Sequence, residues 1–151
     1  MRKEVKALID AIAHETDCID DLIEVMQEQR IAMSEQNVDY VNDLMNETRD
    51  IFFEAQTHDT LRNDWAKKLA ASFACEPKAS SLAACMDNEE KSIFNGTVDR
   101  FTQSIFALKG EMLVLNGLID QNQKYSAMLL SEVSRLRGDE VLQSGTANFR
   151  G

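Results

Sequence analysis

The sequence predicts an all-α protein, in which an elongated antiparallel helical hairpin, a short helical connector and a long third helix form a three-helix coiled-coil-like bundle. Residues that favour turns are scarce, since the 151 residues include one Pro and six Gly, and three of those Gly lie in the last fourteen residues. No stretch shows the apolar–polar alternation of a strand. Apolar residues instead recur at alternating steps of three and four, which keeps one stripe of a helix facing a partner.

The first helix is expected to span about thirty residues and to end within residues 34–37, where polar residues cluster. Its stripe consists of Val5, Leu8, Ile12, Glu15, Ile19, Leu22, Met26, Gln29 and Met33. A linker of only a few residues follows, which predicts an antiparallel partner helix.

Asn37 or Asp39 is expected to cap the second helix by accepting a backbone N–H. The stripe of this helix consists of Val41, Leu44, Thr48, Ile51, Ala55, His58, Arg62, Trp65 and Leu69. Its middle is poor in apolar residues at His58 and Arg62. Either the stripe shifts at that point, or these two side chains meet polar partners.

Pro77 interrupts the helical pattern, because proline lacks a backbone donor and disfavours helix at the residue before it. Ser80 or Ser81 is expected to cap a connector of one or two turns that has Leu82, Cys85 and Met86 on one face. Asp87 or Asn88 is then expected to cap the long third helix, with Glu89 and Glu90 favourably placed in its first turn.

The third helix carries the longest stripe, which predicts a helix roughly 65 Å long. The stripe consists of Phe94, Val98, Phe101, Ile105, Leu108, Met112, Leu115, Ile119, Asn122, Ser126, Leu129, Val133 and Leu136. Gly138 is expected to end this helix. We therefore expect a helical domain over residues 1–137 and a disordered tail over residues 138–151.

A second apolar face accompanies this stripe, formed by Phe106, Leu113, Val114, Leu118, Met128 and Leu130. Two interpretations stand. The third helix is central and covered on both sides by the first two helices, or its second face stays open as a groove for an amphipathic partner helix. Gly96, Gly110 and Gly117 would permit close approach of another backbone, or a bend, at about 1 kcal/mol each in helix stability.

Composition excludes several function classes. The net charge of −10 argues against nucleic acid as a partner, and no apolar run is long enough to cross a membrane. The charged N-terminal residues argue against a secretory signal. Residues 1–36 carry a charge of −5 and residues 91–137 carry +2, which favours packing of the third helix against the first two.

Motifs for catalysis or metal binding are not recognisable. Cys18, Cys75 and Cys85 match no zinc spacing and are expected to be reduced thiols in a cytoplasmic protein. His14 and His58 lack the second ligand of known helical metal motifs and are expected to be solvated or packed helix residues. We therefore expect no cofactor, no metal and no enzymatic activity.

The layout of the chain has a recognisable order. A long acidic hairpin bears Arg62 near the end of its second helix, in THDTLRNDWAKKLA, and a short Pro-containing connector follows. The long helix then carries Asn116 beside Leu118, Ile119 and Tyr125, in LVLNGLIDQNQKYSAMLLSEVSRL. Over about residues 1–137, this layout resembles the FlgN-type flagellar export chaperones.

This resemblance implies a cytoplasmic, non-enzymatic chaperone that binds the terminal helices of hook-associated flagellar proteins. It would prevent their premature assembly and deliver them to the membrane export gate. Phe149 is the one aromatic residue of the tail that could serve at the gate. The residues expected to bind the partner are Phe106, Leu113, Val114, Asn116, Leu118, Ile119, Asn122, Tyr125, Met128 and Leu129.

A structural coiled-coil protein that self-associates through its third helix remains the alternative, and even a chaperone could form a weak homo-oligomer through the same face. A cofactor or metal enzyme on a helical bundle is a third hypothesis, for which the expected ligands are missing from the sequence.

Overall fold

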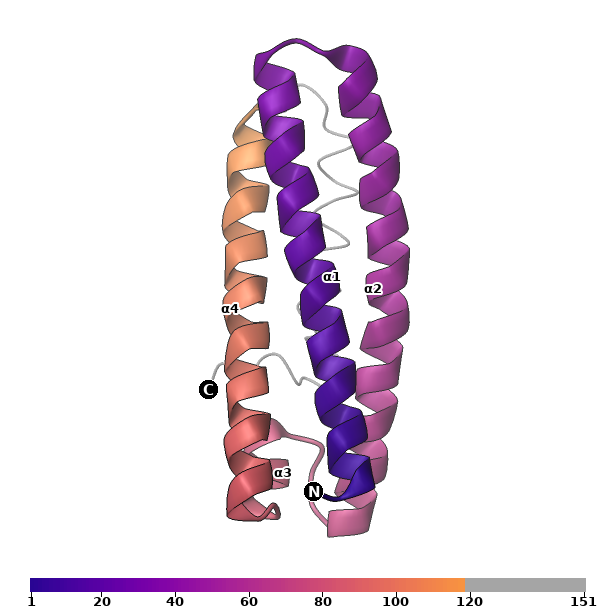
Figure 1. The fold of residues 1–151 in the computed structure, drawn as a ribbon, viewed down its shortest axis with the longest axis vertical. Helices are drawn as coiled ribbons and strands as arrows, with labels where there is room; N and C mark the ends of the chain where they lie inside the picture. The colour runs from indigo at the N-terminus through magenta and orange to yellow at the C-terminus, as the bar shows by residue number, and fades with distance from the viewer. Residues whose placement is uncertain (119–151) are drawn as a thin grey trace.

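The computed structural model describes residues 1–118, and this part of the chain is built from helices. They are α1 (Lys3–Ser34), α2 (Val38–Phe73), α3 (Ala79–Ala84) and α4 (Asn88–Leu118). Figure 1 shows α1 and α2 as an antiparallel hairpin, with α4 lying along α1 and α3 at the end of the bundle near the N-terminus. The predicted all-α architecture is confirmed.

The hairpin turn follows the sequence closely. α1 ends at Ser34, and the backbone N–H of Tyr40 donates to Asn37 Oδ1 at 3.3 Å, so Asn37 is the residue that caps α2. Both hairpin helices end in a left-handed residue that is not glycine, Gln36 after α1 and Ala74 after α2, with φ of 57° and 55°. A left-handed conformation costs an L-residue about 1–2 kcal/mol.

The connector differs from the expectation in one detail. α3 begins at Ala79, directly after Lys78, and no side chain caps it, so the predicted serine cap is wrong. Lys78 is extended and occupies the capping position itself, so the helix starts before either serine can cap it. Leu82 and Met86 are buried as predicted, whereas Cys85 is exposed.

Asp87 and Glu90 form a reciprocal cap at the start of α4. The Glu90 N–H donates to Asp87 Oδ1 at 2.8 Å, and the Asp87 N–H donates to Glu90 Oε1 at 3.2 Å. This pattern is a capping box, in which two otherwise unpaired backbone donors are satisfied together. Arg2 closes the same end of the bundle by donating from its side chain to Glu90 at 2.7 Å and 3.2 Å.

The middle helix of the bundle is α1, so the first of the two interpretations, a central third helix covered on both sides, is wrong for the described residues. α1 packs against both α2 and α4, and it lies between them in Figure 1. α2 and α4 have no close backbone contact in this part of the chain. The reason is that α1 carries apolar residues on two faces, the stripe itself and the flanking Ile9, Ala11 and Cys18, all buried.

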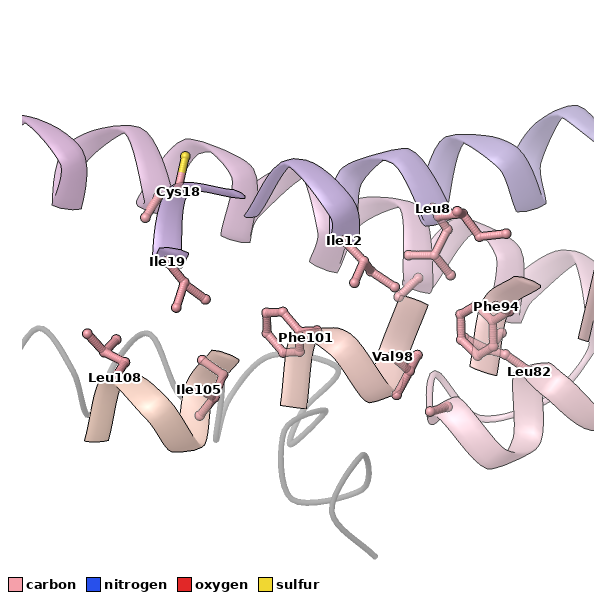
Figure 2. Close-up of a cluster of buried hydrophobic side chains, with 14 of the residues drawn as sticks. Leu8, Ile12, Cys18, Ile19, Leu82, Phe94, Val98, Phe101, Ile105 and Leu108 are labelled. Carbon is pink, nitrogen blue, oxygen red and sulfur yellow. The ribbon is translucent and has the colours of Figure 1, made fainter. Parts of the chain in front are cut away.

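One large cluster of buried apolar side chains runs along most of the bundle, and a smaller one is formed by Val25, Ala32 and Leu44. Figure 2 shows Leu8, Ile12 and Ile19 of α1 facing the apolar side chains of α4, with Leu82 of α3 closing one end. Every predicted stripe position of α4 from Phe94 to Leu115 is buried. The stripe of α1 is also buried from Val5 to Gln29, including its two polar members.

Polar stripe positions of the two hairpin helices meet one another. Gln29 of α1 donates to the Thr48 hydroxyl at 2.6 Å and to the Leu44 carbonyl at 3.3 Å. Glu15 of α1 accepts from Arg62 of α2 at 2.6 Å and 3.2 Å. Because a buried polar group without a partner is costly, two such pairs specify the register of the hairpin.

Charge complementarity between α1 and α4 agrees with the uneven charge of the sequence. Arg100 of α4 lies 2.9 Å from Asp17 and 3.1 Å from Asp20, and the Ser104 hydroxyl donates to Asp20 at 2.6 Å. These residues border the apolar contact between α1 and α4. Arg100 is half-exposed, so its ion pairs contribute little on their own and chiefly orient α4.

No helix in the described part of the chain is long and apolar enough to cross a membrane. The predicted stripe beyond Leu115, the helix end at Gly138 and the tail over residues 138–151 lie outside the described residues.

Candidate partner-binding face

α4 presents an outer apolar face on the side away from the core. Phe106, Leu113 and Val114 are 55%, 68% and 46% exposed, and they lie on a helix whose opposite side is fully buried. Together with Gly110 and Gly117 they define what we call the outer face of α4. A packed helix has no need of apolar residues on its solvent side, so this face requires a separate explanation.

The spacing along the outer face is that of a second helical stripe. Phe106, Gly110, Leu113 and Gly117 follow one another at steps of four, three and four residues. Large and small residues alternate, which forms shallow recesses of the kind that receive the side chains of another helix. The outer face therefore has the geometry of a helix-binding surface.

Gly110 and Gly117 have no side chains, so another helix could approach the backbone of α4 closely at these positions. A Cβ atom added at Gly110 or Gly117 would meet nothing within 4 Å, so neither glycine is needed for packing within the described part of the protein. Each costs the helix about 1 kcal/mol relative to alanine. The close approach of another backbone that the sequence suggested is therefore not made by any described helix.

Other exposed apolar residues of α1, α2 and the hairpin turn do not form a comparable stripe. Phe53 and Leu61 of α2 are 69% and 44% exposed, but the surface between them carries the polar Thr57 and Thr60. Near the hairpin turn, Val38 and Tyr40 are exposed next to polar residues. Among the described residues 1–118, exposed apolar or small residues follow one another over several helical turns on the outer face of α4.

The structure brings together only part of the predicted partner-binding set. Phe106, Leu113 and Val114 lie on the outer face, whereas Asn116 lies toward the packed side and is half-buried. The Asn116 Oδ1 atom is buried and has no hydrogen-bond partner. The side chain of Leu118 and the remaining predicted residues lie outside the described part: Ile119, Asn122, Tyr125, Met128 and Leu129.

Arg62, which contributes to the family resemblance, is a core residue and not a surface contact. It is fully buried, donates to Glu15 and to Asp59 Oδ1 at 2.6 Å, and its guanidinium lies 4.7 Å from the centre of the Phe101 ring. Burial raises the pKa of Glu15 to about 7, and the neighbouring Arg62 opposes that rise. For Arg62, the second alternative for the poor middle of the α2 stripe, polar partners, is thus correct.

Arg62 also joins helices that do not touch through their backbones. It reaches from α2 past α1 to the aromatic face of Phe101 on α4. This contact supports α4 from its inner side and leaves its outer face exposed. The sequence indicated Glu15 and Arg62 separately as polar members of apolar stripes, but it did not pair them.

One family of known proteins is similar to this chain over most of its length. The family model described as FlgN protein matches residues 1–144. No curated protein and no solved structure matches the chain.

Proposed function

The chain belongs to the FlgN family of flagellar export chaperones, and we propose that it binds hook-associated proteins in the cytoplasm before their export. By this proposal it has no enzymatic activity. It keeps its clients from assembling early by occupying their terminal helices, and it delivers them to the export gate. The observation that carries the proposal is the exposed apolar outer face of α4.

The proposed complex is a client helix lying along the outer face. An amphipathic helix offers apolar residues at steps of three and four, which match the steps from Phe106 to Gly117. The client helix would seat its large side chains over Gly110 and Gly117 and would cover Leu113 and Val114. Terminal segments that are disordered when free become helical on binding, and this ordering lowers the affinity.

The binding free energy that the outer face can supply indicates how far the client-binding surface must extend. Covering the exposed parts of Phe106, Leu113 and Val114 is worth about 3–5 kcal/mol in total. Ordering a disordered client costs about 2–5 kcal/mol, whereas a micromolar complex requires about −8 kcal/mol. The outer face of residues 106–117 is therefore too small alone, and the proposal includes the predicted residues from Leu118 to Leu129.

A binding measurement tests the proposal. A peptide with the C-terminal helix of a hook-associated protein, labelled with a fluorophore, is titrated with the purified chain and followed by anisotropy. We expect micromolar or tighter binding. Leu113→Asp should weaken it about 30-fold or more, because it removes an apolar contact and places an unpaired charge in the interface.

Phe53→Asp is the matched control, since Phe53 is as exposed as Leu113 but lies on α2. Its binding should equal that of the unmodified chain. If Leu113→Asp and Val114→Asp both bind normally, the client lies elsewhere. If no hook-associated peptide binds at all, the proposed client class is wrong.

The second candidate function is a structural coiled coil, and the repeated spacing of the outer face favours it as well. Two copies could pair through Phe106, Gly110 and Leu113 in the manner of a coiled-coil seam. Light scattering over a range of protein concentrations separates the two. A stable dimer that a client peptide does not dissociate would favour self-association as the function.

A further inference from the structure

Two pairs of metal-binding residue types face each other across the α1–α2 hairpin. His14 and Cys18 are four residues apart on α1, and Glu54 and His58 are four residues apart on α2. Residues at this spacing lie on the same face of a helix. Antiparallel packing of the hairpin places the two pairs opposite one another, which neither helix reveals by itself.

Three of these side chains already converge. One potential ligand atom from each of Cys18, Glu54 and His58 lies within 4.8 Å of the other two. Around a tetrahedral zinc ion the ligand atoms are about 3.5 Å apart, given metal–nitrogen and metal–sulfur distances of about 2.0–2.3 Å. Small side-chain rotations would therefore close the cluster around an ion.

His58 supplies a separate observation that points to a ligand. Its Nδ1 atom is buried and has no hydrogen-bond partner. Its Nε2 atom lies 3.9 Å from Glu54 Oε1, which is too long for a hydrogen bond. A half-buried imidazole with both nitrogens poorly satisfied gains from coordinating a cation.

His14 lies close enough to the cluster to supply a fourth ligand. Its ring stacks on the His58 ring at 5.7 Å between centroids, and its side chain is exposed, so it can rotate toward the cluster. Cys18 is 5% exposed and lies on the buried side of the cluster, whereas the Glu54 side chain is exposed to solvent. An ion can thus enter past Glu54 and His14 and reach the sulfur.

We propose that Cys18, Glu54, His58 and His14 form a zinc-binding site that links the middle of α1 to the middle of α2. One thiolate, two imidazoles and one carboxylate are ligands that Zn²⁺ accepts in tetrahedral geometry. On binding, the Zn–S bond forms and the Cys18 thiol proton is released to solvent. Figure 2 shows Cys18 directed to a different side of α1 from Ile19, which faces α4.

The site is independent of the proposed client-binding face. It lies on the hairpin, one helical turn before Arg62 on α2, whereas the outer face lies on α4. The buried pairing of Glu15 with Arg62 holds the register that places the two ligand pairs opposite each other. Bound zinc would therefore stabilise the hairpin, with no contact to a client on α4.

Metal titration of the full chain, after removal of bound metal with a chelator, tests the proposal. We expect one equivalent of Zn²⁺ to bind with micromolar or tighter affinity in competition with a chromophoric chelator. Co²⁺ should give the absorption of a tetrahedral site and a thiolate-to-cobalt charge-transfer band. Zn²⁺ should also raise the thermal midpoint.

Variants assign the ligands. Cys18→Ser should abolish the charge-transfer band and weaken Zn²⁺ binding by about tenfold or more. His58→Gln, which leaves the buried core intact, should weaken binding to a similar extent and abolish the thermal shift. Cys75→Ser and Cys85→Ser are matched controls and should bind as the unmodified chain does.

Three results would overturn the proposal. The unmodified chain could fail to bind Zn²⁺ in the micromolar range. The charge-transfer band could survive in Cys18→Ser, or it could disappear in Cys75→Ser or Cys85→Ser. Circular dichroism of each variant verifies that the helices are retained, so that a loss of binding is assigned to the ligand.

Discussion

Replacing Arg62 by leucine tests whether the buried ion pair holds the hairpin in register. Arg62 is fully buried and donates to the two oxygens of Glu15 at 2.6 Å and 3.2 Å, and Glu15 is itself fully buried. Arg62→Leu would leave the Glu15 carboxyl in the core without its cation. It would also remove the contact with Phe101.

Removing one partner of a buried pair costs about 3–5 kcal/mol. The Glu15 carboxyl is left in the core without its cation and must either stay charged or take up a proton. A domain of this size has a total stability of about 5–15 kcal/mol. Arg62→Leu should therefore lower the urea midpoint strongly in unfolding followed by circular dichroism. Arg49→Leu, an exposed arginine on the same helix, should change stability by only about 0.5 kcal/mol.

The double variant Glu15→Leu/Arg62→Leu distinguishes a charge effect from a packing effect. Replacement of both partners by apolar residues removes the unpaired buried carboxyl, so stability should return to within about 1–2 kcal/mol of the unmodified chain. The reasoning is refuted if Arg62→Leu costs less than about 1 kcal/mol. It is also refuted if the double variant is no more stable than the single one.

Three further predictions concern the helix ends and the outer face of α4. Gly110→Ala should raise the free energy of unfolding by about 1 kcal/mol and at the same time weaken client binding, because the added methyl group lifts the client helix. Ala74→Gly should raise it by roughly 0.5–1 kcal/mol, since glycine relieves the left-handed strain at the end of α2; thermal unfolding measures both. Hydrogen bonds from Arg2 lower the pKa of Glu90 to about 2; the bonds from the Arg2 side chain have the largest effect, followed by the bond from its backbone N–H. This stabilisation is fully present above the ordinary pKa of 4.5 and is lost as the pH falls toward 2, so Glu90→Gln should flatten the acid side of a stability–pH curve measured in urea.

Each of these predictions has a contrary result. Gly96→Ala is the control for the outer face, because Gly96 is exposed on α4 and has open space around its Cα. If Gly96→Ala weakens client binding as much as Gly110→Ala, the effect is not specific to the face. Destabilisation by Ala74→Gly would contradict the strain argument. An acid limb that is the same in Glu90→Gln would exclude Glu90 as its source.

Local features of the fold were predicted well from the sequence. The end of α1 and a capping residue at Asn37 or Asp39 and at Asp87 or Asn88 were predicted from side chains close to the helix ends, and the structure selects Asn37 and Asp87. The return bond, from the Asp87 N–H to Glu90, was not predicted. The serine cap of the connector was wrong, since the extended Lys78 occupies the position before the first helical residue, Ala79. A helix of six residues has too little periodicity for its start to be placed from sequence.

The candidate site was predicted in part. Phe106, Leu113 and Val114 were chosen because they lie off the main stripe, and the structure places them together on the exposed side of α4. Asn116 was chosen from the family resemblance and lies toward the packed side. The face of a helix on which a residue lies follows from its spacing to other residues. A resemblance to a family does not by itself say which face a residue occupies.

The sequence by itself determined that this chain is helical, where its hairpin turns, and which side of each helix is buried. These properties depend on the helical period, and residues three or four positions apart are sufficient to define them. It also marked Glu15, Gln29, Thr48 and Arg62 as polar interruptions of apolar stripes.

Only the tertiary structure decided what those interruptions mean. Glu15 and Arg62, Gln29 and Thr48, and the facing pairs at Cys18 and His58 are brought together by the register of two antiparallel helices. Periodicity leaves that register open, because one stripe can slide along another by whole turns and still bury its apolar residues. It likewise leaves open which helix is central. α1 takes that place because it has two apolar faces to cover, and α4 is left with its outer face exposed.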